Sequence, residues 1–117
     1  MITNLPLFQV YGAMARHSAE GLKVSATNIA NADQPGYKAA KVESFEAFLS
    51  RTTAQPRGLS TPFQILTADT PASPNGNSVS LEYEMFASSD ALGQHNLALS
   101  VYSKSLDLLR TAIGKRG

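Results

Sequence analysis

Residues 80–114, SLEYEMFASSDALGQHNLALSVYSKSLDLLRTAIG, form the most regular stretch of this 117-residue sequence. Ten positions alternate by four and three residues without a break, and eight of them are apolar, a pattern typical of a coiled-coil seam. These positions are Leu81, Met85, Ser88, Leu92, His95, Leu99, Tyr102, Leu106, Leu109 and Ile113. We predict one long helix here, with Ser80 as its N-cap and acidic side chains in the first turn. At ~1.5 Å per residue it would be roughly 50 Å long.

A second helical pattern lies near the start of the chain. Apolar or small residues recur at helical spacing at Leu7, Tyr11, Met14, Ser18, Leu22, Ser25 and Ile29. Pro6 suits a first helical turn, and Gln34-Pro35-Gly36 ends the pattern because proline cannot continue the helix. We predict a helix over about residues 6–32. Gly12 and Gly21 each cost it about 1 kcal/mol relative to alanine, so these glycines are either tolerated or mark a close approach between helices.

The middle of the chain has a different composition. Between residues 51 and 78, sixteen of 28 residues are Ser, Thr, Pro, Gly or Asn, and four of the six prolines lie there. This composition predicts a loop or a poorly ordered segment. Phe63–Leu66 is able to form a strand or hairpin arm, and Ser44–Leu49 a turn or two of helix.

These regions together predict a mainly α protein, a single structural unit in three parts. Residues 1–33 carry the N-terminal helix, 34–79 a loop-rich middle with room for a short hairpin, and 80–117 the C-terminal heptad helix. We expect the two long helices to pair as a coiled coil, because neither can bury its apolar stripe alone.

Composition excludes several classes of protein. There is no cysteine for a disulfide or thiolate metal site, and the net charge of +1 comes with no basic cluster of the kind that nucleic acid requires. No run of 18 apolar residues exists to span a membrane. The N-terminal residues lack the features of a cleaved signal peptide, so we expect a cytoplasmic protein or one exported without such a signal.

No arrangement of residues predicts catalysis, a cofactor or a metal. His95 and Asp107 lie twelve residues apart on one predicted helix, about 18 Å along its axis, so neither can orient the other. His95 is expected to be a packed seam residue, and His17 a surface or interface residue beside the seam. Glu43 and Glu46 are expected on a solvated face. We therefore expect no enzyme, with no catalytic, cofactor-binding or metal-binding residues.

One contiguous motif carries a family resemblance. Residues 25–40 read SATNIANADQPGYKAA, in which a helix ending in Asn28-Ile-Ala-Asn31 is followed by Asp33 and a Pro35-Gly36-Tyr37 turn. From the residues alone, Asn28, Asn31 and Asp33 are too few for a calcium loop and are expected to cap the helix end. The motif resembles the N-terminal signature of the flagellar basal-body rod family, with Gln34 departing from the usual threonine. The ending Tyr102-x3-Leu106-x2-Leu109-Arg110 is similar to the proximal rod proteins of that family, and the resemblance covers about residues 1–45 and 76–117.

The resemblance implies a structural role in bacterial motility. It implies export by the flagellar type III apparatus without a cleaved signal, and folding into the periplasmic rod of the basal body. The assembly seam would consist of Leu7, Tyr11, Met14, Leu22, Ile29, Leu81, Met85, Leu92, Leu99, Tyr102, Leu106, Leu109 and Ile113. The implied partners are further copies in a helical assembly, other rod proteins, the adapter that joins the rod to the membrane ring, and the export apparatus. Neither nucleic acid nor membrane insertion is implied.

Two alternatives stay open. Within the family, the chain would be another type of proximal rod protein, distinguished by its position in a basal body. From another class, it would be a cytoplasmic coiled-coil regulator or chaperone, which requires a preformed helical dimer in the free protein.

Overall fold

The computed structural model describes residues 6–114, so the outer ends of the predicted terminal segments, 1–5 and 115–117, lie outside the described residues. The elements follow in the order α1 (Pro6–Ala30), β1 (Ala40–Val42), α2 (Phe45–Thr52), a 3-10 turn η2 (Gly58–Ser60), β2 (Ile65–Thr67) and α3 (Leu81–Gly114). The fold is mainly helical, as predicted, and both long helices begin and end close to their predicted bounds.

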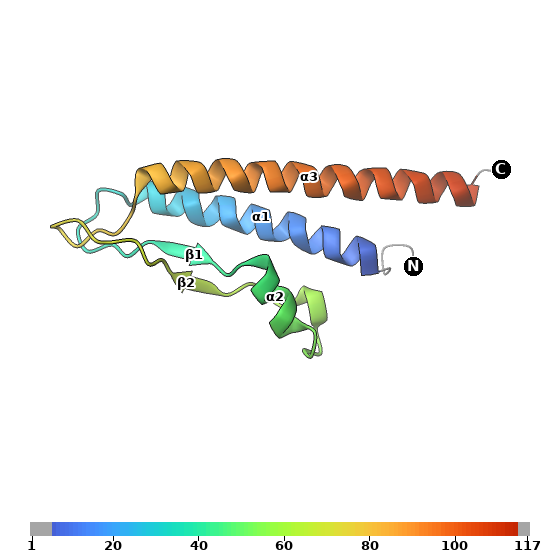
Figure 1. The fold of residues 1–117 in the computed structure, drawn as a ribbon, viewed down its shortest axis with the longest axis horizontal. Helices are drawn as coiled ribbons and strands as arrows, with labels where there is room; N and C mark the ends of the chain where they lie inside the picture. The colour runs from blue at the N-terminus through green and yellow to red at the C-terminus, as the bar shows by residue number, and fades with distance from the viewer. Residues whose placement is uncertain (1–5, 115–117) are drawn as a thin grey trace.

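The two long helices lie side by side and run antiparallel (Figure 1). The rings of Phe8 near the start of α1 and Tyr102 in the second half of α3 meet edge-on, with centroids 5.4 Å apart. Ser25 near the end of α1 contacts Glu84 in the first turn of α3. The last turns of α3 extend beyond the first turn of α1, and the molecule measures 67 × 29 × 16 Å.

The middle segment packs along one side of α1 (Figure 1). β1 and β2 form a two-stranded antiparallel sheet in which Lys41 pairs with Leu66, so the predicted hairpin arm is present. Ser44 caps α2 by accepting a hydrogen bond from the backbone N–H of Ala47, at 3.1 Å. Residues 51–78, whose composition predicted a loop, therefore contain the end of α2, the 3-10 turn η2 and the strand β2.

Small residues dominate the contact between α1 and α3. Ala15 and Ala98 are buried there, and a Cβ added to Gly21 would lie 3.6 Å from the Cβ of Ala91. Gly21 thus marks a close helix approach, whereas a Cβ on Gly12 would meet nothing within 4 Å. Small side chains let the two backbones come close, and the bulky residues beside them remain at the edges of the contact.

Candidate functional site

Asn28, the first asparagine of the motif, joins three elements through one buried amide. Its Nδ2 donates to the backbone oxygen of Ala40 at 2.8 Å and to Oε2 of Glu84 at 2.9 Å. Its Oδ1 accepts from the backbone N–H of Ala40 at 3.0 Å and from the hydroxyl of Tyr37 at 3.2 Å. Only 1% of Asn28 is exposed. The residue therefore links α1 to the start of β1 and to α3, beyond the capping role expected from the sequence.

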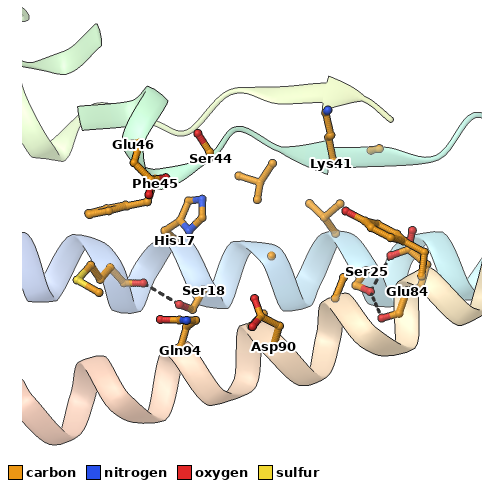
Figure 2. Close-up of a pocket in the computed structure, with 18 residues that line it drawn as sticks. His17, Ser18, Ser25, Lys41, Ser44, Phe45, Glu46, Glu84, Asp90 and Gln94 are labelled. Carbon is orange, nitrogen blue, oxygen red and sulfur yellow. Dashed lines mark hydrogen bonds between the residues drawn. The ribbon is translucent and has the colours of Figure 1, made fainter. Parts of the chain in front are cut away.

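Glu84 completes this cluster from α3. Its carboxylate is buried and accepts hydrogen bonds from two uncharged donors, the Asn28 amide and the Ser25 hydroxyl, the latter at 2.7 Å. Figure 2 shows Ser25 and Glu84 facing each other across the α1–α3 contact. Glu84 lies in the first turn of its helix, where the partial positive charge of the helix N-terminus favours a carboxylate. The sequence predicted acidic side chains in the first turn of this helix, but it did not predict that Glu84 is buried.

The turn after α1 is held by a second asparagine that sequence reasoning missed. Asn77 is buried, and its Nδ2 donates to the backbone oxygens of Asn31 at 2.9 Å and Gln34 at 2.7 Å. Gly36 has φ of +75°, a backbone conformation that residues with a side chain rarely adopt. The segment before α3 therefore closes over the motif turn. No local pattern marks Asn77, because its partners lie more than 40 residues away.

The hairpin is anchored by an ion pair between a buried carboxylate and a partly exposed arginine. Glu43 is 4% exposed, and its carboxylate accepts hydrogen bonds from the Arg51 guanidinium, with Nε–Oε1 at 2.8 Å, and from the backbone N–H of Gln64. The hydrogen bond from Arg51 holds the pKa of Glu43 below its usual range, against the opposing effect of burial. The expectation of a solvated face is therefore wrong for Glu43 and holds for Glu46, which is exposed.

His17 was predicted to be a surface or interface residue, and it lies at an interface within the chain. It packs between Phe45 and Phe63, with ring centroids 5.6 and 5.3 Å away, and its Nε2 donates to the backbone oxygen of Glu43 at 2.6 Å. It is therefore part of the packing of the hairpin against α1 and is half-buried there. His95 is packed as predicted, with Nδ1 donating to the backbone oxygen of Ala15 at 3.0 Å.

The remaining motif residues divide into two groups. Asn31 caps the last turn of α1, with its side-chain amide donating to the oxygen of Thr27 at 2.8 Å, as predicted. Tyr37 is half-buried and bonded to Asn28 within the chain. Asp33, Pro35 and Gly36 are exposed around the tip of the turn.

Only part of the predicted seam lies in the α1–α3 contact. On α3 the face turned to α1 carries Glu84, Ala91 and Ala98, one position before the predicted Met85, Leu92 and Leu99. Of the predicted set, Tyr11, Met14, Leu22, Tyr102, Leu106 and Leu109 are partly buried, whereas Leu7, Ile29, Leu81, Met85, Leu92, Leu99 and Ile113 are exposed. The exposed group has fractional exposures from 39% for Ile29 to 67% for Met85.

Other bulky apolar side chains on α3 are exposed as well. Tyr83, Phe86, Leu97 and Leu108 are 46%, 69%, 56% and 73% exposed, and none belongs to the predicted seam. At 3.6 residues per turn, Leu97 and Leu108 lie on the flank of α3 roughly opposite Leu92 and Leu99. The helix pair therefore presents apolar side chains on two sides after its own contact is made.

A groove of about 590 Å³ lies between α1, β1 and α3. His17 and Phe45 lie on one side of it, and Asp90 and Gln94 of α3 on the other (Figure 2). Within residues 6–114, no three His, Asp or Glu side chains are grouped in a way that would hold a metal ion. No helix in the described part of the chain is long and apolar enough to cross a bilayer.

Comparisons with known proteins give no relative. No protein-family model matches this chain, and no curated protein matches it. The family resemblance therefore depends on the residues of the motif and of the C-terminal ending alone.

Proposed function

We propose that this chain is a structural subunit of the bacterial flagellar basal-body rod, of the proximal type called FlgB. The observation that best supports the proposal is the exposure of leucines on the long helix pair. Leu92 and Leu99 are 49% and 45% exposed although α3 is already paired with α1. Burying a fully exposed leucine contributes about 1.5–3 kcal/mol, so covering the exposed half of either side chain with a neighbouring subunit would contribute about 1 kcal/mol. A slender helix pair with apolar sides is suited to a wall built from many subunits.

The motif turn supports the same proposal. Asn28, Tyr37 and Ala40 fold the chain sharply back after α1, so that the hairpin lies along the outside of the helix pair. In this proposal α1 and α3 form the wall of a helical tube, and the hairpin lies between neighbours. Export through the flagellar type III apparatus delivers the chain unfolded, and the exposed leucines are covered on incorporation. The further partners are other rod proteins and the adapter to the membrane ring.

Leu99→Asp tests the role of the exposed leucines. Because Leu99 is almost half exposed, the variant monomer should stay folded, with an unchanged far-ultraviolet circular dichroism spectrum. A carboxylate at a covered subunit contact costs several kcal/mol unless it is paired, so assembly and swimming should be lost while export continues. The assays are secretion and motility of a strain that carries the variant in place of its natural copy.

Ser100→Asp is the matched control, since it adds the same charge at the next position, on the polar exposed side of α3. This control strain should swim. Normal swimming of the Leu99→Asp strain would remove the leucine contact from the proposal. A stable helical dimer of the free chain, together with normal swimming of a deletion strain, would favour the cytoplasmic regulator or chaperone instead.

A further inference from the structure

Five residues on one flank of α3 form a ridge, which we define as Leu81, Met85, Leu92, Leu99 and Leu106. They share a helix face because their spacings are close to whole turns. The first four are between 45% and 67% exposed, and Leu106 is half-buried. Leu92, Leu99 and Leu106 repeat every seven residues, as one stripe of a coiled coil does.

A furrow runs between α1 and α3 on the other flank. It is lined by Leu7, Val10, Tyr11 and Met14 of α1 and by Leu97 and Val101 of α3. Leu7 and Leu97 are 52% and 56% exposed, so the furrow is open to solvent. Met14 also lines the larger groove beside β1, so the two hollows are neighbours along the helix pair.

We propose that the ridge of one copy packs into the furrow of a second copy. This inference rests on the proposed assembly of the chain and names the surfaces that meet. Leu7 and Met14 are seven residues apart, as are Leu92 and Leu99, so the furrow has the length of two neighbouring ridge leucines. Neither set contains a charged residue, so the contact removes no ion from water.

The position of the two surfaces determines the kind of assembly. Leu97 and Leu99 are two residues apart, about 200° around the helix, so one partner cannot cover both. A ridge-to-ridge dimer would leave the furrow of each copy open. A ridge-to-furrow contact joins two different surfaces, leaves one of each free at the ends, and continues with further copies. The expected product is an open or ring-shaped array.

Cysteine cross-linking tests this contact, because the chain contains no cysteine of its own. The full-length Leu97→Cys protein is mixed with Leu92→Cys, Leu99→Cys or Leu106→Cys in turn, concentrated, and treated with a short bis-maleimide. At least one mixture should give a covalent dimer in far higher yield than either protein alone. A double variant that combines Leu97→Cys with the ridge cysteine that reacts best in these mixtures should give a ladder beyond the dimer. Ser100→Cys mixed with Leu97→Cys is the control and should react little.

Three results would overturn the contact. The first is a Leu99→Cys protein that cross-links to itself in the same yield as to Leu97→Cys. The second is a double variant that stops at the dimer. The third is a full chain that stays monomeric up to its solubility limit. The deletion strain separates this inference from the proposed function. A non-motile deletion strain without ridge-to-furrow cross-links overturns the contact alone, whereas a ladder together with a motile deletion strain overturns the rod function alone.

Discussion

Asn28 makes hydrogen bonds through both N–H groups and both acceptor positions of its side-chain amide. Replacing it should therefore destabilise the fold. Asn28→Ala leaves the Ala40 peptide group and the Glu84 carboxylate short of partners in a buried place. Each unsatisfied buried group costs about 1–3 kcal/mol, so the free energy of unfolding should fall by several kcal/mol. Urea denaturation followed by circular dichroism measures the loss.

Asn31→Ala provides the comparison, since it removes only a local bond to the last turn of α1. It should cost less than about 1 kcal/mol. Equal losses in the two variants would show that Asn28 acts as an ordinary helix cap.

Substitutions at Gly36 and Gly12 should have opposite effects on the stability of the chain. Gly36→Val forces a β-branched residue into φ of +75° and should destabilise the turn and impair rod assembly. Gly12→Ala enters open space on a helix and should stabilise the chain by up to about 1 kcal/mol. Both should be exported, because an unfolded chain has no need of the turn. Secretion and motility assays of the two strains make the test, and a Gly36→Val strain that swims like the wild type would contradict it.

At the scale of elements, the Glu43–Arg51 pair makes the hairpin sensitive to acid. The folded pKa of Glu43 is lowered, chiefly by the Arg51 hydrogen bond, so folding favours the ionised carboxylate. The pair therefore contributes stability above the unfolded pKa of Glu43, and this contribution is lost as the pH falls through the lower folded pKa. In Glu43→Gln, stability at neutral pH should fall and its decline below about pH 4.5 should be shallower.

Acid titration of the unfolding free energy compares the two proteins. Glu46→Gln is the control, because that carboxylate is exposed, and it should follow the wild type. A Glu43→Gln protein with the same acid profile as the wild type would show that the ion pair does not stabilise the folded chain.

The helices were predictable because their signals are local. Pro6, the Gln34-Pro35-Gly36 turn and the Ser80 cap mark their ends, and Ser80 Oγ accepts from the Tyr83 N–H as expected. The sequence predicted that α3 faces α1 through Met85, Leu92 and Leu99. The structure has the preceding residue in each case, Glu84, Ala91 and Ala98, on that face. Periodicity identified the bulky stripe, but the closest approach selected the small residues beside it.

The candidate site was predictable only in part. The motif around Asn28 was recognisable, but Glu84 and Asn77 are 56 and 46 residues from their respective partners in it, Asn28 and Asn31. Glu43, likewise, lacked a local sign of burial, since the backbone N–H of Gln64, which its carboxylate also accepts from, lies 21 residues away. Polar side chains of this kind become buried through tertiary contacts, which spacing along the chain does not encode.

At the scale of the whole molecule, the elongated shape and the exposed apolar surface are related. A chain 67 Å long and 16 Å thick cannot enclose both sides of a 34-residue helix. α3 contacts α1 largely through small residues and leaves Leu92, Leu97, Leu99 and Leu108 about half exposed or more. In a rod wall these leucines would be the contact surface, and the hairpin would lie between neighbours.

The most direct test of the proposed rod function is density, at side-chain resolution, for a flagellar basal body isolated from the organism that encodes this chain. We expect this chain to occupy the proximal rod, with α1 and α3 in the wall and with Leu92 and Leu99 covered by a neighbouring subunit. A proximal rod in which this chain is absent, or in which it is present with both leucines facing solvent, would rule out the proposed function.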